Sequence, residues 1–405
     1  MSSVSIEALG SVVKHQLDSV SDELREISLQ IHARPELAYE EVFAHELLTD
    51  YLERKGFRVV RQACGLKTAF VAEYTSAAAQ NAPASSKVAT VGFLSEFDAL
   101  PKIGHACGHN LIAICGVAAA LGFKAAVDKF GIAAHLKVFG SPAEETTGGK
   151  IHMIKAGAFE NVDLALMAHP GNADFVYAQY LALQGLHVSY HGKSSHAAAA
   201  PWDGVNALDA VVMAYNSISM LRQQSLPTNR VHGIITNGGA APNTIPDFAS
   251  SIYYIRSQRL AQLNELKAKI LGCLEGAAAA TGARLSLEEE AAFADVRQNE
   301  VLARLYDRHI RSLGATIAMD RNKQEEMPKG STDMGNVTHV VPGIHPIFDI
   351  GCNSDIHTED FREAAKSQLA HERTLRCAAA LSLVGLECAT DAQLLAEATA
   401  DFASK

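Results

Sequence analysis

The sequence predicts an α/β protein in which a smaller α+β domain interrupts the main domain. Between residues 87 and 171, apolar strand-like runs alternate with a helix-like run, and polar residues follow the ends of the strands. Near Gly185 the pattern changes to alternating strands and long helices, and it changes back near Asn299. A chain of 405 residues, 48% of them hydrophobic, also favours two domains over one.

The amino-terminal part is expected to be helical. Ser21 stands where an N-cap would, acids follow it, and apolar residues recur at helical spacing until Pro35 interrupts the pattern. The segment TSAAAQNAPASSK, residues 75–87, has no such pattern and is predicted to be an exposed loop.

Three buried strands are predicted to have polar residues at their carboxyl ends. The first ends in Glu96 and Asp98, the second runs into a Gly-containing loop with Glu144 and Glu145, and the third ends at His169. Sites in open α/β sheets lie at this edge, so these side chains are expected to lie together. The strands are expected within 87–101, 133–150 and 162–171, and a buried Ala-rich helix within 111–127.

The inserted domain is expected to hold two strand–helix units. Residues 186–221 predict a strand, a loop of small residues and a long helix. Residues 230–257 predict a hairpin, because NGG is a tight-turn signal, and residues 259–282 predict a second helix. The predicted organisation is a main domain formed by 1–185 and 299–405 and an insert at 186–298.

Composition narrows the class of protein. The formal charge is −10 and there is no long basic run, which disfavours nucleic acid and anionic membranes as partners. Seven scattered cysteines do not suggest a disulfide framework. The first residues lack the pattern of a secretory signal, and no apolar run reaches the roughly 18–20 residues of a membrane span. We therefore expect a soluble, cytoplasmic protein.

The motif GHACGHN, residues 104–110, places His105, Cys107 and His109 at alternate positions. Thiolate and imidazole suit zinc and its divalent neighbours, and the glycines allow two side chains to converge. A Cys–His nucleophile pair is an alternative, although such a pair usually takes its base from elsewhere in the chain and no oxyanion loop is evident. A buried cysteine with incidental histidines is a third possibility.

Glu144 and Glu145 are neighbours at a strand end, so their side chains are expected to point to opposite sides. This division favours one as a metal ligand and the other as a proton carrier, while two solvated loop acids remain the alternative. His169 and His357 are further ligand candidates, because they fall at strand ends or loops of the same domain as Asp98.

Ten motifs in order resemble the aminoacylase/carboxypeptidase family of co-catalytic metallopeptidases. They are HARPEL, SEFDALP, GHACGHN, GSPAEETTGGK, AHPG, GKSSHAA, PNTIPD, YIRS, GSTDMGNV and HT, spread over His32 to Phe361. The resemblance is strongest to the amidohydrolase branch, which includes indole-acetyl-amino-acid hydrolases, aminobenzoyl-glutamate hydrolases and aminoacylase-1-like dipeptidases. It implies a mixed-sheet catalytic domain with an inserted α+β dimerisation (lid) domain, and a homodimer.

The resemblance also implies roles for individual residues. One or two divalent ions per subunit (zinc or manganese, or else cobalt) would be held by Cys107, His109, Glu145, His169 and His357. Cys107 would bridge the ions. Glu144 would be the general base, and Asp98 would orient His109.

For the inserted domain, the resemblance implies contacts with the substrate. His196 would reach the partner subunit's active site and donate to the oxyanion, and Asn243 and Arg256 would hold the substrate's carboxylate. The expected reaction is hydrolysis of the amide bond of an N-acyl amino acid or dipeptide with a free carboxylate. A non-catalytic metal-binding or assembly protein on the same scaffold is the alternative. Two departures stand out: Asn110 replaces a frequent acid, and Glu96 replaces a histidine of classical members.

Overall fold

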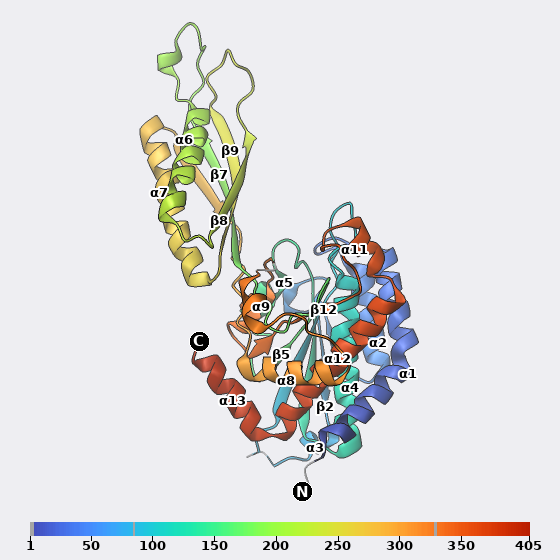
Figure 1. The fold of residues 1–405 in the computed structure, drawn as a ribbon. Coiled ribbons are helices and arrows are strands. Elements are labelled where there is room, and N and C mark those ends of the chain that lie inside the picture. The colour runs from blue at the N-terminus through green and yellow to red at the C-terminus, as the bar shows by residue number, and fades with distance from the viewer. Residues whose placement is uncertain (1–3, 84–85, 328–329) are drawn as a thin grey trace. The chain divides into compact units, whose positions relative to one another are not determined.

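The computed structural model describes residues 4–83, 86–327 and 330–405. Contacts within the chain divide it into two compact units (Figure 1). Unit 1 comprises Met1–Gln179 and Val296–Lys405, and unit 2 comprises Tyr180–Asp295. These boundaries lie a few residues before the positions 185 and 298 that the sequence suggested.

Unit 1 is built on a mixed six-stranded sheet, which confirms the predicted α/β fold class. The strand order is β1-β2-β4-β3-β5-β11, in which β3, β4, β5 and β11 are parallel and β1 and β2 are antiparallel to their neighbours. A parallel pair, β12 with β6, lies beyond this sheet. The strands are β1 (Arg58–Arg61), β2 (Phe70–Thr75), β3 (Ala89–Glu96), β4 (Ala134–Ser141), β5 (Leu164–Leu166), β6 (His169–Gly171), β11 (Gly343–Ile344) and β12 (Ile347–Asp349).

Strand β3 is buried along its whole length because both faces of the sheet are covered. Val91 and Phe93 belong to the main core, and Leu94 belongs to a smaller core on the other face. Helix α4 packs against β3 through Gly116, where a Cβ atom would lie 2.3 Å from the carbonyl oxygen of Leu94. This close contact aligns the amino terminus of α4 with the carboxyl end of β3.

Helices α1, α4 and α12 pack against one another over the main core and lie side by side in Figure 1. Helices α8 and α13 pack against α12, while α5 and α10 pack together over the smaller core. The helices of unit 1 are α1 (Ile6–Ala33), α2 (Val42–Arg54), α3 (Ala77–Gln80), α4 (His109–Phe130), α5 (Gly149–Lys155), α8 (Glu300–Ser312), α9 (Arg321–Glu326), α10 (Met334–Thr338), α11 (Glu359–Ala364), α12 (Gln368–Thr390) and α13 (Ala392–Ala403), with a 3₁₀ turn η1 (Ala63–Gly65).

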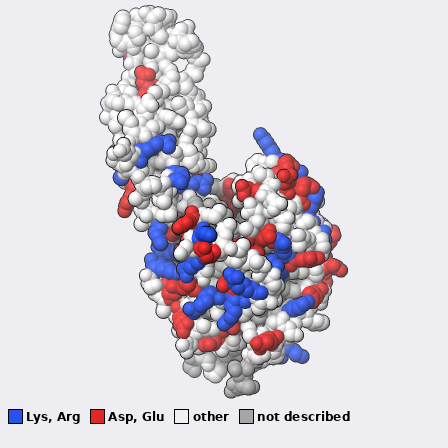
Figure 2. All heavy atoms as spheres, in the orientation of Figure 1, with Lys and Arg blue, Asp and Glu red and all other residues white. Residues whose placement is uncertain are grey.

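Unit 2 is a four-stranded antiparallel sheet, ordered β10-β7-β9-β8, whose core is shared with two helices. The strands are β7 (Ala182–His191), β8 (Arg230–Asn237), β9 (Phe248–Ser257) and β10 (Arg284–Glu289), the helices are α6 (Ala207–Met220) and α7 (Leu260–Thr281), and η2 (Pro201–Asp203) and η3 (Leu221–Gln224) are 3₁₀ turns. Figure 2 shows few charged side chains on the visible face of this unit.

Exposed apolar side chains are concentrated in unit 2. Of the 15 large hydrophobic residues exposed in the described chain, ten lie there. Helix α6 contributes Met213 and Met220, and the edge strand β8 contributes Ile234 and Ile235. This concentration of exposed apolar side chains in one unit favours an interaction surface there.

Three local expectations were wrong. The first helix begins at Ile6, capped by Ser5, and Ser21 lies inside it with its hydroxyl 3.0 Å from His371 Nε2. A serine followed by acids resembles a cap even when the helix has already begun. The strands β8 and β9 do pair antiparallel, but residues 238–247 join them as a long loop instead of a tight turn. The expected loop at 75–87 contains the short helix α3, and its residues 84 and 85 lie outside the described residues.

Helix α4 is long and apolar enough to cross a membrane by length and composition. However, 89% of its most apolar window is buried inside the protein, where it packs against β3, α1 and α12. Its composition is therefore explained by its position in the core of unit 1.

Candidate metal centre

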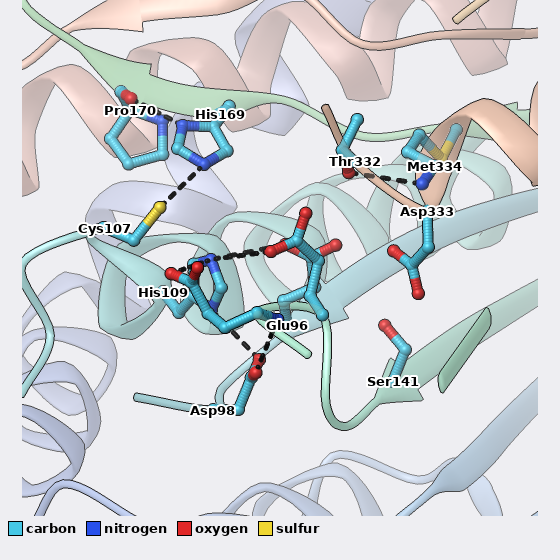
Figure 3. A network of polar contacts seen from close by, with 12 residues as sticks. Glu96, Asp98, Cys107, His109, Ser141, His169, Pro170, Thr332, Asp333 and Met334 are labelled. Atoms are coloured by element: carbon cyan, nitrogen blue, oxygen red, sulfur yellow. Dashed lines mark hydrogen bonds and ion pairs between the residues drawn. The ribbon is translucent and has the colours of Figure 1, made fainter. Parts of the chain in front are cut away.

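The centre is organised around Asp98, which follows the end of β3. Its Oδ1 accepts a hydrogen bond from His109 Nδ1 at 3.1 Å, and its Oδ2 accepts one from the backbone N–H of Glu145 at 3.0 Å. The first bond leaves Nε2 of His109 free to bind a metal. Asp98 therefore positions two candidate ligands at once (Figure 3).

Cys107 and His109 reach the centre from the amino terminus of α4. Gly108, at φ +82°, separates them and lies so close to Pro170 that a Cβ atom would be 2.6 Å from its ring. Cys107 Sγ lies 3.4 Å from Nε2 of His169, whose Nδ1 donates to the Pro170 carbonyl at 2.7 Å. In Figure 3 the thiol and this imidazole point toward each other.

Glu144 and Glu145 both approach the same nitrogen, contrary to expectation. Their carboxylates lie 3.8 and 3.7 Å from His109 Nε2, because residues 144–147 form a turn rather than an extended strand end. The turn starts at Ala143, whose φ of +60° is strained for a residue with a Cβ. The buried carboxylate of Glu41 accepts the Ala143 N–H at 3.0 Å and stabilises this conformation.

His357 completes the centre from the loop before α11. Its backbone N–H donates to the carbonyl of Ala106 at 2.9 Å, which ties it to the segment that holds Cys107. Its Nε2 lies 3.6 Å from Glu145 Oε1, and its φ of +66° is again strained.

The side chains form overlapping groups with the spacing of metal ligands. Cys107, His109 and His169 form one group, and Cys107, Glu145 and His357 form a second, each with donor atoms within 4.8 Å of one another. Glu96, His109 and Glu144 form a third. Two atoms of these groups, Nε2 of His109 and Oε1 of Glu145, are buried without a hydrogen-bond partner. They are therefore available as metal ligands, and the whole set of ligand atoms fits divalent cations.

The pKa shifts reflect deep burial among like charges. Burial, followed by the negative charges of Glu96 and Glu145, raises the pKa of Glu144 well above its usual range. Burial and the charge of Glu145 likewise raise the pKa of the Cys107 thiol. Burial, with His109 nearby, lowers the pKa of His169 to about 3 and keeps that imidazole neutral, as a metal ligand must be.

His105 lies outside the three groups. It is buried beside His32, with ring centroids 6.2 Å apart, and burial lowers its pKa to about 3. Asn110 has a structural contact: its side-chain amide donates to Ser28 Oγ at 2.9 Å and to the carbonyl of Ala365 at 3.1 Å. An aspartate could not make these two bonds.

The predicted residues of unit 2 fall at two places within that unit. His196 and Asn243 lie together, because the Asn243 carbonyl accepts the N–H of Ala197 at 3.0 Å. His196 Nδ1 accepts the N–H groups of Ala198 and Ala199, which leaves Nε2–H as a donor. Arg256 lies near the other end of β9, about eight residues from Phe248, or roughly 26 Å along the strand.

Two supporting residues were missed by sequence reasoning. Glu41 stands in a polar segment, AYEEV, that has nothing to mark it as buried. Lys150 follows two glycines in the loop of Glu144 and is also fully buried, although lysine is normally exposed. No signal in a single sequence distinguishes these charges from solvated ones.

A buried thiol, imidazoles and carboxylates with the spacing of metal ligands fit one class of protein, the metal-dependent hydrolases. Residues 182–281 match the model of a peptidase dimerisation domain. The chain is 44% identical to the Xaa-Arg dipeptidase of Mus musculus, over 100% of this chain and 94% of that protein. It is 31% identical to a polypeptide of the p-aminobenzoyl-glutamate hydrolase of Escherichia coli K12, over 63% of this chain and 55% of that one.

Solved structures share the fold. A dinuclear metal-binding peptidase of the M20 family from Bacillus subtilis superposes with a TM-score of 0.66 at 18% identity, covering 91% of this chain and 99% of that chain. An aminohydrolase structure from methicillin-resistant Staphylococcus aureus gives a TM-score of 0.75, also at 18% identity, over 93% and 98% of the two chains.

The chain belongs to the M20 family of metallopeptidases. It is accordingly an enzyme that hydrolyses amide bonds with the help of divalent metal.

Proposed function

We propose that the protein is a dipeptidase with a two-ion centre in which Cys107 is common to both ions. The observation behind this proposal is that Cys107 belongs to two ligand groups, one with His109 and His169 and one with Glu145 and His357. Zinc, manganese or cobalt would suit this mixture of thiolate, imidazole and carboxylate. Two such ions lower the pKa of bound water toward about 7 and polarise the scissile carbonyl.

Glu144 is proposed as the general base. Of the two neighbouring glutamates, Glu145 has its backbone held by Asp98 and its carboxylate beside His357. The carboxylate of Glu144 is buried near His109 and has no part in the two groups that contain Cys107. It is therefore free to take a proton from water and deliver it to the leaving nitrogen.

The protein is further proposed to be a homodimer. Strand β8 is an edge strand with Ile234 and Ile235 exposed, whereas the opposite edge, β10, has charged residues that discourage pairing. The match to a dimerisation domain covers β8 and α6. Pairing of β8 with a second copy would satisfy its free backbone groups and cover the apolar residues of α6.

Two subunits would then share each active site. His196 and Arg256 lie toward opposite ends of the unit 2 sheet, so one copy of this unit is poorly arranged to bring both to one small substrate. We propose that His196 and Asn243 come from the partner subunit, with His196 donating to the oxyanion, and that Arg256 comes from the same chain. The guanidinium would bind the substrate's carboxylate in a bidentate manner.

The substrate is proposed to be a dipeptide with a free carboxylate, and those ending in arginine are the first to test, by analogy with the mouse relative. N-acyl amino acids with aromatic, β-alanyl or aminoacyl groups form the comparison panel. With reduced cysteines and a soluble-type fold, the proposed compartment is the cytoplasm.

The test is release of free amino acid from this panel after chelation and after return of manganese, zinc or cobalt. Chelation should abolish hydrolysis and at least one metal should restore it. E144A should lose about 10²–10⁴-fold in kcat while retaining its metal. E160A, which alters an exposed glutamate of the same unit, is the matched control. Near wild-type turnover by E144A would disprove the assigned mechanism.

A further inference from the structure

Among the described residues, Lys150 is the only lysine or arginine that is buried. It stands near the start of α5, and its ammonium group forms ion pairs with Glu96 and, at 2.5 Å, with Asp333. Its backbone N–H also donates to Asp333 Oδ2 at 2.9 Å. Two ion pairs therefore hold the ammonium and a third bond fixes the backbone of Lys150, and all three side chains are inaccessible to solvent.

Glu96 would otherwise compete for the metal. Its Oε2 is buried without a hydrogen-bond partner and lies 3.8 Å from Nε2 of His109. That nitrogen belongs both to the group with Cys107 and His169 and to the group with Glu96 and Glu144. An imidazole nitrogen binds one ion, so the two groups exclude each other at His109.

The two ligand groups that share His109 favour different metals and differ in their effect on Glu144. A thiolate and imidazoles favour zinc and cobalt, whereas carboxylates favour manganese. An ion held by Glu96 and Glu144 would also occupy the carboxylate needed as general base. Figure 3 shows Glu96 and Asp333, the two partners of Lys150, in the same network of polar contacts as His109.

We propose that Lys150 is a positioning residue that withholds Glu96 from the metal and so directs the ion at His109 to Cys107 and His169. The inference rests on the proposed function. The ammonium neutralises the Glu96 carboxylate, and its fixed charge repels a divalent cation from that side of His109. The contacts of the Lys150 ammonium are with Glu96 and Asp333, which lie outside both groups that contain Cys107, so Lys150 is a positioning residue and not a ligand.

The test compares K150M, E96Q and the double variant E96Q/K150M with the wild type. K150M alone leaves two buried carboxylates without a cation and can fail to fold. E96Q/K150M restores the net charge of the trio and removes the competing ligand, so it keeps the inference testable. K155M, which alters an exposed lysine of the same helix, is the matched control.

The principal readout is the thiolate-to-cobalt charge-transfer absorption of the cobalt-loaded protein, supported by metal affinities from chelator competition. We expect K150M to lose much of this absorption and to shift its preference toward manganese over zinc by about 10–100-fold. E96Q, E96Q/K150M and K155M should keep the wild-type absorption. A purely structural lysine would change stability without moving this signal.

An unchanged K150M spectrum would overturn the role of Lys150. So would a loss of the absorption in K150M that the added E96Q change, in E96Q/K150M, fails to restore. Absence of the thiolate absorption from the wild type itself would overturn the metal assignment of the proposed function, and this inference with it. The two failures are therefore distinguishable in one experiment.

Discussion

Replacing Asp98 by asparagine should weaken metal binding, because Asp98 holds two of the candidate ligands in place. Asp98 accepts hydrogen bonds from His109 Nδ1 and from the N–H of Glu145. Asparagine keeps one acceptor oxygen, and its amide group would face the other donor. Loss of such an outer partner lowers metal affinity by about 10–100-fold.

The consequence for stability can be calculated. At a free metal concentration of about 100 times Kd, binding stabilises the wild type by about 2.7 kcal/mol, whereas a 100-fold weaker site gains only ~0.4 kcal/mol. The metal-dependent rise in Tm should therefore be smaller in D98N by about 5 °C, given ~2–4 °C per kcal/mol for domains of 150–250 residues.

Thermal melts with and without metal, together with chelator competition, measure this difference. D163N is the matched control, because Asp163 also accepts a backbone N–H, that of Thr90 at 2.8 Å, at the opposite end of β3. That control should lose some stability but keep the full metal-dependent rise. If D98N bound metal within twofold of the wild type, the assignment of Asp98 as the residue that orients His109 would be refuted.

Three further changes test other parts of the structure. I234K should weaken the dimer by about 100-fold in sedimentation experiments, because a charge on an edge strand opposes pairing. Burial raises the pKa of Glu41 from 4.5 to about 7, so this group should cost the wild-type apoprotein about 2.5 kcal/mol of stability as pH rises from 5 to 8, and E41Q should lose less stability by that amount. G108A should lower stability by about 1–2 kcal/mol, and more if Pro170 must move, with weaker metal binding.

Each of these three has a result that would contradict it. If the I234K dimer kept its affinity, β8 would be excluded from the interface. The control is V60K, which places a lysine at an exposed position of another edge strand, β1 in unit 1. For Glu41 the sign follows from a folded pKa above the unfolded one: the proton is held more tightly by the folded protein, so this contribution is lost with rising pH. Equal pH slopes for wild type and E41Q would contradict it. Wild-type metal affinity in G108A would show that the backbone there tolerates a side chain.

The sequence alone located the candidate residues of the centre that lie in short motifs or at the ends of predicted strands. Cys107 and His109 lie within one short motif, and Glu144, Glu145 and His169 follow predicted strands, so local patterns located them. The parallel order of the strands then brings these ends to one edge of the sheet. The metal-ligand grouping of these residues remains a prediction for metal-binding experiments to test.

Features that depend on distant segments were not predictable. Lys150 is buried because Glu96 and Asp333 reach it from the end of β3 and the start of α10, and no local pattern encodes that meeting. Glu41 likewise contacts Ala143, which is about a hundred positions away in the chain. The meeting of Asn243 with the segment after His196 also joins residues that are far apart in the chain.

The different roles proposed for the carboxylates follow from their partners rather than from their positions in the chain. Glu96 is the last residue of β3, and Asp98 follows two residues later, beyond the strand. Asp98 faces the ring N–H of His109 and accepts its hydrogen bond, while Glu96 faces the ammonium of Lys150 and is neutralised. The partner of each acid decides its chemistry. K150M removes the cation beside Glu96, so it should change the role of Glu96 without changing any acid. D98N changes an acid itself, and the two variants are therefore expected to alter metal binding in different ways.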